Sequence, residues 1–226
     1  MRINYLFSGL DKEKGFTSEQ AECLREDIKE NSNIVFIASL FKDHEKTEFN
    51  TKIILNMFKN IDINFKEVNI IDNTVSYDDT KEIIRKSDIV FLLGGSPTNQ
   101  MKSINKYGIK EDLCKKDFIL GVSAGSMNQT KRVIYEGEYE DEMPIENYEG
   151  LGFFDTVIYP HLELDNQKYM EELYRVSKIT KVIALPNPSF IRIKNKNIEF
   201  IGDYYIVENE RLEKGNFGKI SKVRER

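Results

Sequence analysis

The chain has 226 residues, of which 40% are hydrophobic, and a formal net charge of −5. This length predicts one fairly large domain over residues 1–226, since domains typically contain about 50 to 200 residues. The acidic balance disfavours a nucleic-acid partner, because phosphate binding needs a clustered basic face. All apolar runs are shorter than the roughly 18 residues of a membrane span. We therefore expect a cytoplasmic protein with no membrane contact.

The two cysteines, Cys23 and Cys114, lie far apart in the sequence. Two distant thiols make neither a disulfide framework nor a zinc site. No group of His, Cys and carboxylate residues has the spacing of metal ligands. The sequence therefore predicts no metal and no cofactor.

Strand-like and helix-like segments alternate through the first half of the chain. Short apolar runs, which are typical of strands buried on both faces, predict strands over residues 1–7, 34–38, 65–71, 89–93 and 118–122. Apolar residues at helical spacing predict helices over residues 49–58, 78–86 and 97–107.

The second half is less regular. Residues 130–152 are rich in Glu, Tyr and Gly and predict an irregular excursion. We expect strands over residues 156–159 and 182–185 and a helix over residues 166–178. Residues 190–193 and 198–201 are expected to form a hairpin. Together the elements predict an α/β fold with three layers: a mostly parallel central sheet, helices on both faces, and an antiparallel hairpin near the C-terminus.

Residues 121–125 read Gly-Val-Ser-Ala-Gly, which matches the G-x-S-x-G pattern of a nucleophile elbow. An apolar strand precedes Ser123 and helix-compatible residues follow it, as the elbow requires. The turn is tight, and Gly121 and Gly125 remove side chains that would collide with neighbouring backbone. A glycine-rich turn that cradles phosphate is the alternative interpretation. We expect Ser123 to be a nucleophile.

A second glycine pair, Gly94-Gly95, ends the preceding predicted strand. Ligands of open α/β sheets bind at the carboxyl ends of the strands. The N–H groups of this pair could therefore face a substrate oxygen, and with the N–H of Ala124 they could form an oxyanion hole. An ordinary strand-to-helix turn is the other interpretation.

A serine nucleophile needs a base, which is most often histidine. The chain contains only His44, in a charged stretch, and His161, directly after an apolar strand and Pro160. His161 is therefore the better candidate. A third group should orient its imidazole, and spacing leaves several candidates open: Glu142, Asp155, Glu163, Asp165 and Asn187.

Five segments occur in the same order as in the dipeptidase E and cyanophycinase group of serine peptidases. They are residues 90–95 (VFLLGG), 120–126 (LGVSAGS), 141–145 (DEMPI), 159–161 (YPH) and 182–186 (VIALP). The chain resembles this family over residues 89–202, and the resemblance implies a fold similar to that of class I glutamine amidotransferases.

The resemblance implies a role for each matching residue. Ser123 would be the nucleophile and His161 the base, while Gly95 and Ala124 would supply oxyanion N–H groups. Gly94 would belong to the substrate site. Glu142 could bind the amino group of a short peptide, or it could be one charge among many in a charged segment.

One position departs from the family pattern. The family has Glu or Asp after the strand that ends at 185–186, and this chain has Asn187 followed by Pro188. An amide can hold the imidazole but carries no charge, and an Asp to Asn change in a serine protease triad lowers kcat by roughly 10⁴. Glu163 and Asp165 are the carboxylates nearest in sequence to His161 and could substitute.

We therefore expect a serine-type peptidase, dipeptidase or aminopeptidase-like, that hydrolyses short peptides through a seryl acyl-enzyme. The alternative is a catalytically weak or inactive family member that acts as a binding module, which Asn187 favours. A glutamine amidotransferase is disfavoured because its nucleophile would be cysteine. The sequence does not decide between a monomer and a homodimer, and it does not identify the preferred side chains of the peptide.

Overall fold

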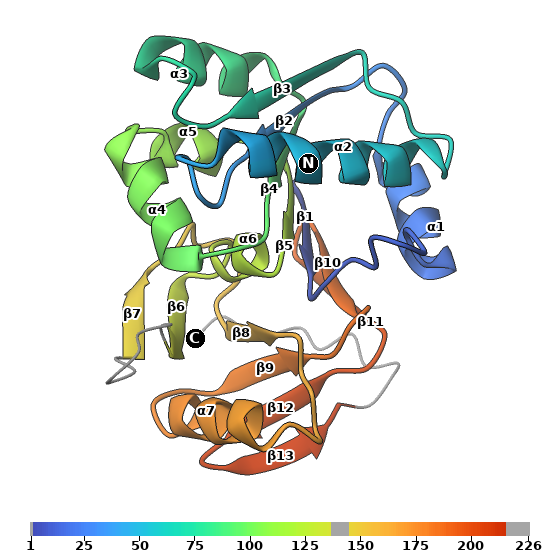
Figure 1. The fold of residues 1–226 in the computed structure, drawn as a ribbon. Helices are drawn as coiled ribbons and strands as arrows, with labels where there is room; N and C mark the ends of the chain where they lie inside the picture. Colours follow the sequence, from blue (N-terminus) through green and yellow to red (C-terminus); the bar gives the residue numbers. More distant parts are fainter. Residues whose placement is uncertain (1, 137–144, 216–226) are drawn as a thin grey trace.

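The computed structural model describes residues 2–136 and 145–215 of the chain (Figure 1). Its main sheet has seven strands in the order β11-β10-β1-β5-β4-β2-β3. Their bounds are β1 Ile3–Phe7, β2 Asn33–Ile37, β3 Glu67–Ile71, β4 Ile89–Leu92, β5 Phe118–Val122, β10 Phe190–Lys194 and β11 Asn197–Ile201. Strands β1 to β5 run parallel to one another, and the β10–β11 hairpin adds two antiparallel strands at one edge. The predicted mostly parallel sheet with a C-terminal hairpin is confirmed.

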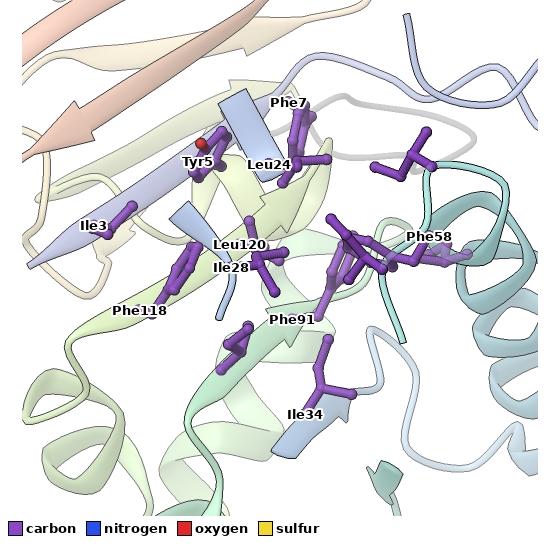
Figure 2. Packing of buried hydrophobic residues seen from close by; sticks show 14 of the residues in the cluster. Ile3, Tyr5, Phe7, Leu24, Ile28, Ile34, Phe58, Phe91, Phe118 and Leu120 are labelled. Atoms are coloured by element: carbon purple, nitrogen blue, oxygen red, sulfur yellow. The ribbon is translucent and has the colours of Figure 1, made fainter. Parts of the chain in front are cut away.

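Alternate residues of each buried strand point to opposite faces of the sheet, as the pleat requires. On one face, Phe36 and Phe91 stack with ring centroids 5.2 Å apart. They belong to a cluster that also holds Leu24 of α1 (Ser18–Asp27) and Phe58 of α2 (His44–Lys59). Figure 2 shows Leu24, Phe58 and Phe91 of this cluster between the strands and the helices. The two helices therefore cover this face.

The other face carries the neighbouring residues of the same strands. Val35 and Val90 pack there with side chains from three helices, α3 (Tyr77–Lys86), α4 (Pro97–Lys106) and α5 (Lys110–Cys114). Among these, Ile84 and Ile104 are fully buried. Helices on both faces of the sheet confirm the predicted three layers.

A second sheet of four strands has the order β13-β12-β9-β8. Its bounds are β8 Val157–Pro160, β9 Val182–Leu185, β12 Tyr205–Glu208 and β13 Arg211–Lys214, and α7 (Gln167–Ser177) packs against it. Figure 1 shows this sheet and α7 below the main sheet. The sequence predicted β8, β9 and α7 within two residues, but it did not predict that β8 and β9 leave the main sheet.

The two sheets share an apolar cluster. Leu6 and Ile191 of the main sheet meet Ile158, Ile183 and Leu185 of the second sheet, and all five are buried. This packing brings the carboxyl ends of β8 and β9 close to that of β1.

Two other parts of the chain differ from the sequence-based prediction. Residues 130–152 were expected to be irregular, but β6 (Arg132–Glu136) pairs antiparallel with β7 (Ile145–Glu149). The sequence did not indicate this strand pair, because β7 is rich in polar residues and alternates exposed and half-buried positions without an apolar run. Helix α1 was not predicted, although a capping box between Thr17 and Gln20 marks its start.

None of the helices in the described ranges combines the length and the hydrophobicity of a membrane span.

Candidate active site

Ser123 lies at the sharp turn between β5 and the short helix α6 (Ala124–Met127). Its backbone has φ 52° and ψ −111°, a strained conformation for a residue with a side chain. The turn is held by the Ser123 N–H, which donates to the Phe7 carbonyl at 3.0 Å. The predicted strand, turn and helix are therefore present, with the serine at the strained position.

Neither glycine of the motif leaves room for a side chain. A Cβ on Gly125 would lie 2.1 Å from the carbonyl oxygen of Leu92 in β4. A Cβ on Gly121 would lie 2.5 Å from the carbonyl oxygen of Gly125. Backbone atoms cannot yield at such distances, so the elbow can pack against β4 only with glycine at position 125, and the turn itself can close only with glycine at position 121.

His161 directly follows β8 and, like Ser123, has a positive φ of 60°. Its Nε2 lies 2.8 Å from Ser123 Oγ, which is hydrogen-bonding distance. The end of β8 is held by Tyr169 in α7, whose hydroxyl donates to the Pro160 carbonyl at 2.6 Å. Two strained residues from different sheets are thus brought into contact, the pattern expected where strain serves a function.

Asn187 follows β9 and presents its side chain to the other ring nitrogen. Its Oδ1 lies 3.1 Å from His161 Nδ1. Neither carboxylate proposed as a substitute is hydrogen-bonded to this ring: Glu163 accepts a hydrogen bond from Asn166, and Asp165 is exposed. The geometry thus places the amide of Asn187, rather than either of these carboxylates, in the orienting position.

Burial lowers the pKa of His161 below its usual range. The hydrogen bond with Asn187 and the charge of Glu163 act in the opposite direction but do not outweigh burial. A lowered pKa favours the neutral form of this imidazole. A neutral ring with its proton on Nδ1 has a free lone pair at Nε2, which faces Ser123.

The Gly94-Gly95 turn lies beside the elbow. A Cβ on Gly94 would lie 3.5 Å from the Cβ of Ser123, and Gly95 has a φ of +141°, which favours glycine. A Cβ on Gly95 would also collide with the Ser39 hydroxyl, at 2.2 Å. Ala124 opens α6, so its N–H has no acceptor within the helix. The structure therefore brings both predicted oxyanion donors to the surroundings of Ser123.

A buried polar network fixes this turn relative to the elbow. Gln100 of α4 donates to the carbonyl of Leu93 at 3.0 Å, and its side-chain oxygen accepts from Asn128 at 3.0 Å. Asn128 caps the end of α6 and in turn accepts from the Tyr148 hydroxyl of β7 at 2.9 Å. Both amide side chains are fully buried. Buried amides with satisfied hydrogen bonds rigidify their surroundings.

Sequence reasoning missed Ser8, which follows β1 and is fully buried. Its Oγ accepts from the His161 backbone N–H at 2.8 Å and lies 2.7 Å from the Leu185 carbonyl and 2.9 Å from Asn187 Oδ1. The signal was present, because Ser8 follows a buried parallel strand just as Ser123 does.

Glu142, the predicted ligand of a peptide amino group, lies outside the described residues. No group of three or more His, Cys, Asp or Glu side chains that could hold a metal ion occurs in the described part of the chain.

A search of curated proteins finds no match in sequence. Two solved structures share the fold. A peptidase from an acI-B1 Actinobacterium is 13% identical with a TM-score of 0.65, over 97% of this chain and 96% of that one. A candidate peptidase E protein from Listeria monocytogenes EGD-e is 17% identical with a TM-score of 0.67, over 89% of this chain and 98% of that one.

The model of Peptidase family S51 matches residues 6–201, a range that contains every described candidate site residue. Because this match covers most of the chain, the protein belongs to Peptidase family S51, the dipeptidase E family of serine peptidases that its sequence resembles.

Proposed function

We propose that the protein hydrolyses short peptides through a seryl acyl-enzyme, with Ser123 as the nucleophile and His161 as the general base. The observation that carries this proposal is the 2.8 Å contact between Ser123 Oγ and His161 Nε2 at a strained nucleophile elbow. Membership of a serine peptidase family supports the reaction type. The choice of short peptides rests on the likeness to dipeptidase E.

The first half of the reaction forms the acyl-enzyme. Ser123 Oγ attacks the carbonyl carbon of the scissile peptide bond while its proton moves to His161 Nε2. The carbonyl oxygen becomes negatively charged, and the N–H groups of Gly95 and Ala124 are the proposed donors to it. One such donor typically contributes about 10² to 10³ in rate.

Acylation is complete when the carbon–nitrogen bond breaks and His161 gives its proton to the leaving amine, which leaves the acyl group on Ser123. The second half hydrolyses this ester. His161 then takes a proton from water, the resulting hydroxide attacks the ester, and Ser123 recovers its proton. Every proton transfer passes through one ring nitrogen, so the other ring nitrogen must keep its proton on the side of Asn187.

A second candidate function is binding without turnover, and Asn187 is the observation that favours it. An amide oxygen can accept the Nδ1 proton but does not carry the charge that stabilises an imidazolium. In that case a peptide would occupy the site without acylating Ser123.

A fluorophosphonate probe separates the two functions, because it reports the nucleophile without a known substrate. We expect the wild-type protein to be labelled and Ser123→Ala to remain unlabelled. Absence of wild-type labelling over roughly pH 6 to 9, on both sides of the usual histidine pKa, would refute the enzyme and leave the binding function.

A library of dipeptides and tripeptides then identifies the substrate class. We expect release of free amino groups by the wild-type protein and none by Ser123→Ala. If the probe labels Ser123 but the library is not cleaved, the serine hydrolase chemistry stands and the short-peptide substrate is wrong.

A further inference from the structure

Two fully buried amide side chains hold the turn that carries Gly95, one of the proposed oxyanion donors. Gln100 Nε2 donates to the Leu93 carbonyl at 3.0 Å, just before the turn. Asn128 Nδ2 donates to the Pro97 carbonyl at 2.9 Å, just after it. The same Nδ2 donates to Gln100 Oε1 at 3.0 Å, so the two amides are joined. The turn is therefore held at both of its ends.

Asn128 also contacts the helix that carries the second proposed donor, Ala124. It caps the end of α6, and its backbone N–H donates to the Ala124 carbonyl at 3.0 Å. Asn128 thus contacts both sides of the proposed oxyanion hole. Two donors stabilise one oxyanion only if both reach the same oxygen, at about 2.7 to 3.1 Å. The placement of the turn relative to α6 therefore matters for the reaction.

The orientation of both amides is determined by their neighbours. Gln100 Nε2 faces three backbone carbonyls, those of Ile37, Ala38 and Leu93, at 3.0 to 3.3 Å. Carbonyls only accept, so this end of the side chain must be the NH₂ and the other end the oxygen. That oxygen faces the NH₂ of Asn128. Asn128 Oδ1 consequently points the other way and needs a donor.

Tyr148 of β7 supplies this donor. Its hydroxyl donates to Asn128 Oδ1 at 2.9 Å. The strand has other attachments, since the Leu151 N–H donates to the Asn128 carbonyl at 2.8 Å and the Gly150 N–H donates to the Lys131 carbonyl at 3.1 Å. Loss of the hydroxyl alone would therefore leave a buried acceptor without a partner while the end of β7 stays docked.

We propose that Asn128 is a positioning residue for the oxyanion hole. Its amide, completed by the Tyr148 hydroxyl, fixes the Gly94-Gly95 turn relative to Ala124. This inference rests on the proposed function for its catalytic meaning. The position of the turn is a property of the folded protein and can be measured whether or not the protein turns over a substrate.

The first measurement is the ¹H–¹⁵N NMR spectrum of the backbone amides. We expect Tyr148→Phe to displace the signals of Gly94 and Gly95 by more than their line width, because the Asn128 amide loses the partner that holds it. Unchanged signals of these two glycines in Tyr148→Phe would overturn the inference, whatever the activity of the protein. This variant also decides the question if Asn128→Ala does not fold.

The second measurement is fluorophosphonate labelling of Ser123, separated into the rate at saturating probe and the half-saturating concentration. The phosphoryl oxygen of the probe takes the place of the substrate oxygen, so a displaced donor slows reaction more than it weakens binding. We expect the saturating rate to fall roughly 10- to 100-fold in Asn128→Ala and roughly 3- to 10-fold in Tyr148→Phe, with half-saturation within about twofold. A loss confined to half-saturation would overturn the inference.

The double variant tests whether Tyr148 acts through Asn128. We expect Tyr148→Phe to cause no further loss of rate in the Asn128→Ala background, because the acceptor of the hydroxyl is already gone. The full loss in both backgrounds would refute the connection. If the wild-type protein is not labelled at all, the proposed function fails, and the NMR measurement still decides where the turn is held.

Tyr5 provides the matched control. It is fully buried, and its hydroxyl donates to Asp27 Oδ2 at 2.7 Å on the face of the sheet that α1 covers. Tyr5→Phe loses the same atom away from Asn128. We expect it to lower stability in urea without changing the signals of Gly94 and Gly95 or the rate of labelling. An equal loss of rate in Tyr5→Phe would show that lowered stability, rather than the placement of the turn, slows Ser123.

Discussion

Replacing Asn187 with aspartate restores the charge that the site lacks. The new carboxylate would stand at the place of Asn187 Oδ1, 3.1 Å from His161 Nδ1, and would attract the imidazolium that forms when Ser123 is deprotonated. Two unit charges about 4 Å apart attract by about 1 kcal/mol in water and about 4 kcal/mol at an effective dielectric constant near 20.

The expected gain lies between these values. Asn187 is exposed, whereas His161 is partly buried. We therefore expect about 1.5 to 3 kcal/mol of transition-state stabilisation, or a roughly 10- to 100-fold faster reaction. This is less than the roughly 10⁴ lost on Asp to Asn exchange in a buried triad, because solvent screens the exposed carboxylate.

The assay is the second-order rate of fluorophosphonate labelling as a function of pH. The carboxylate should also raise the pKa of His161, which burial now holds low. The base must be neutral to act, so the acidic limb of the variant should move to higher pH. Asn187→Ala is the matched control and should be slower than the wild type. An Asn187→Asp rate equal to or below that of the wild type at every pH would refute the reasoning.

Three further predictions concern stability. Gly125→Ala should cost about 1 to 3 kcal/mol or more in urea unfolding, because its Cβ would meet a β4 carbonyl at 2.1 Å; an unchanged midpoint would contradict this. Asp27→Ala should cost about 3 to 5 kcal/mol in thermal unfolding, because it strips the buried Arg192 of two hydrogen bonds of 2.8 Å; a cost below about 1 kcal/mol would mean that water replaces the carboxylate. The hydrogen bond to Asp72 raises the pKa of His44, so this pair stabilises the fold fully below about pH 6.5, and the contribution is lost as pH rises through the raised value. Stability of His44→Gln should therefore vary less with pH in urea titrations, and an unchanged slope would contradict the pairing.

The main sheet and the elbow could be predicted from the sequence because their signals are local. Residues 118–122 are an uninterrupted apolar run that ends at a glycine-flanked serine, and the structure places β5 and the turn there. The order of the motifs also predicted the family, which the match over residues 6–201 confirms.

The second sheet could not be predicted in the same way. Strands β8 and β9 read as buried parallel strands, and they are, but local pattern does not say which sheet a strand joins. That is decided by the apolar cluster between the sheets, where residues distant in sequence, such as Leu6 and Ile183, meet. Strands β12 and β13 carry mixed exposure and were missed for the same reason as β7.

The sequence named candidate site residues but not the contacts between them. Ser123, His161 and Asn187 were named from motifs, and their contacts of 2.8 Å and 3.1 Å follow from the fold. Ser8 was missed because a serine at the end of the first strand matches no motif. Its partners lie more than 150 positions away in the sequence.

The candidate site is divided between two sheets, so its geometry depends on how these sheets pack against each other. Ser123 is carried by the main sheet, whereas His161 and Asn187 follow strands of the second. A partial opening of the apolar cluster between the sheets would separate hydroxyl from imidazole while each sheet kept its own hydrogen bonds. Labelling of Ser123 should therefore be lost at lower denaturant concentrations than the circular dichroism signal of the backbone. The contact between hydroxyl and imidazole would then break before the strands and helices unfold.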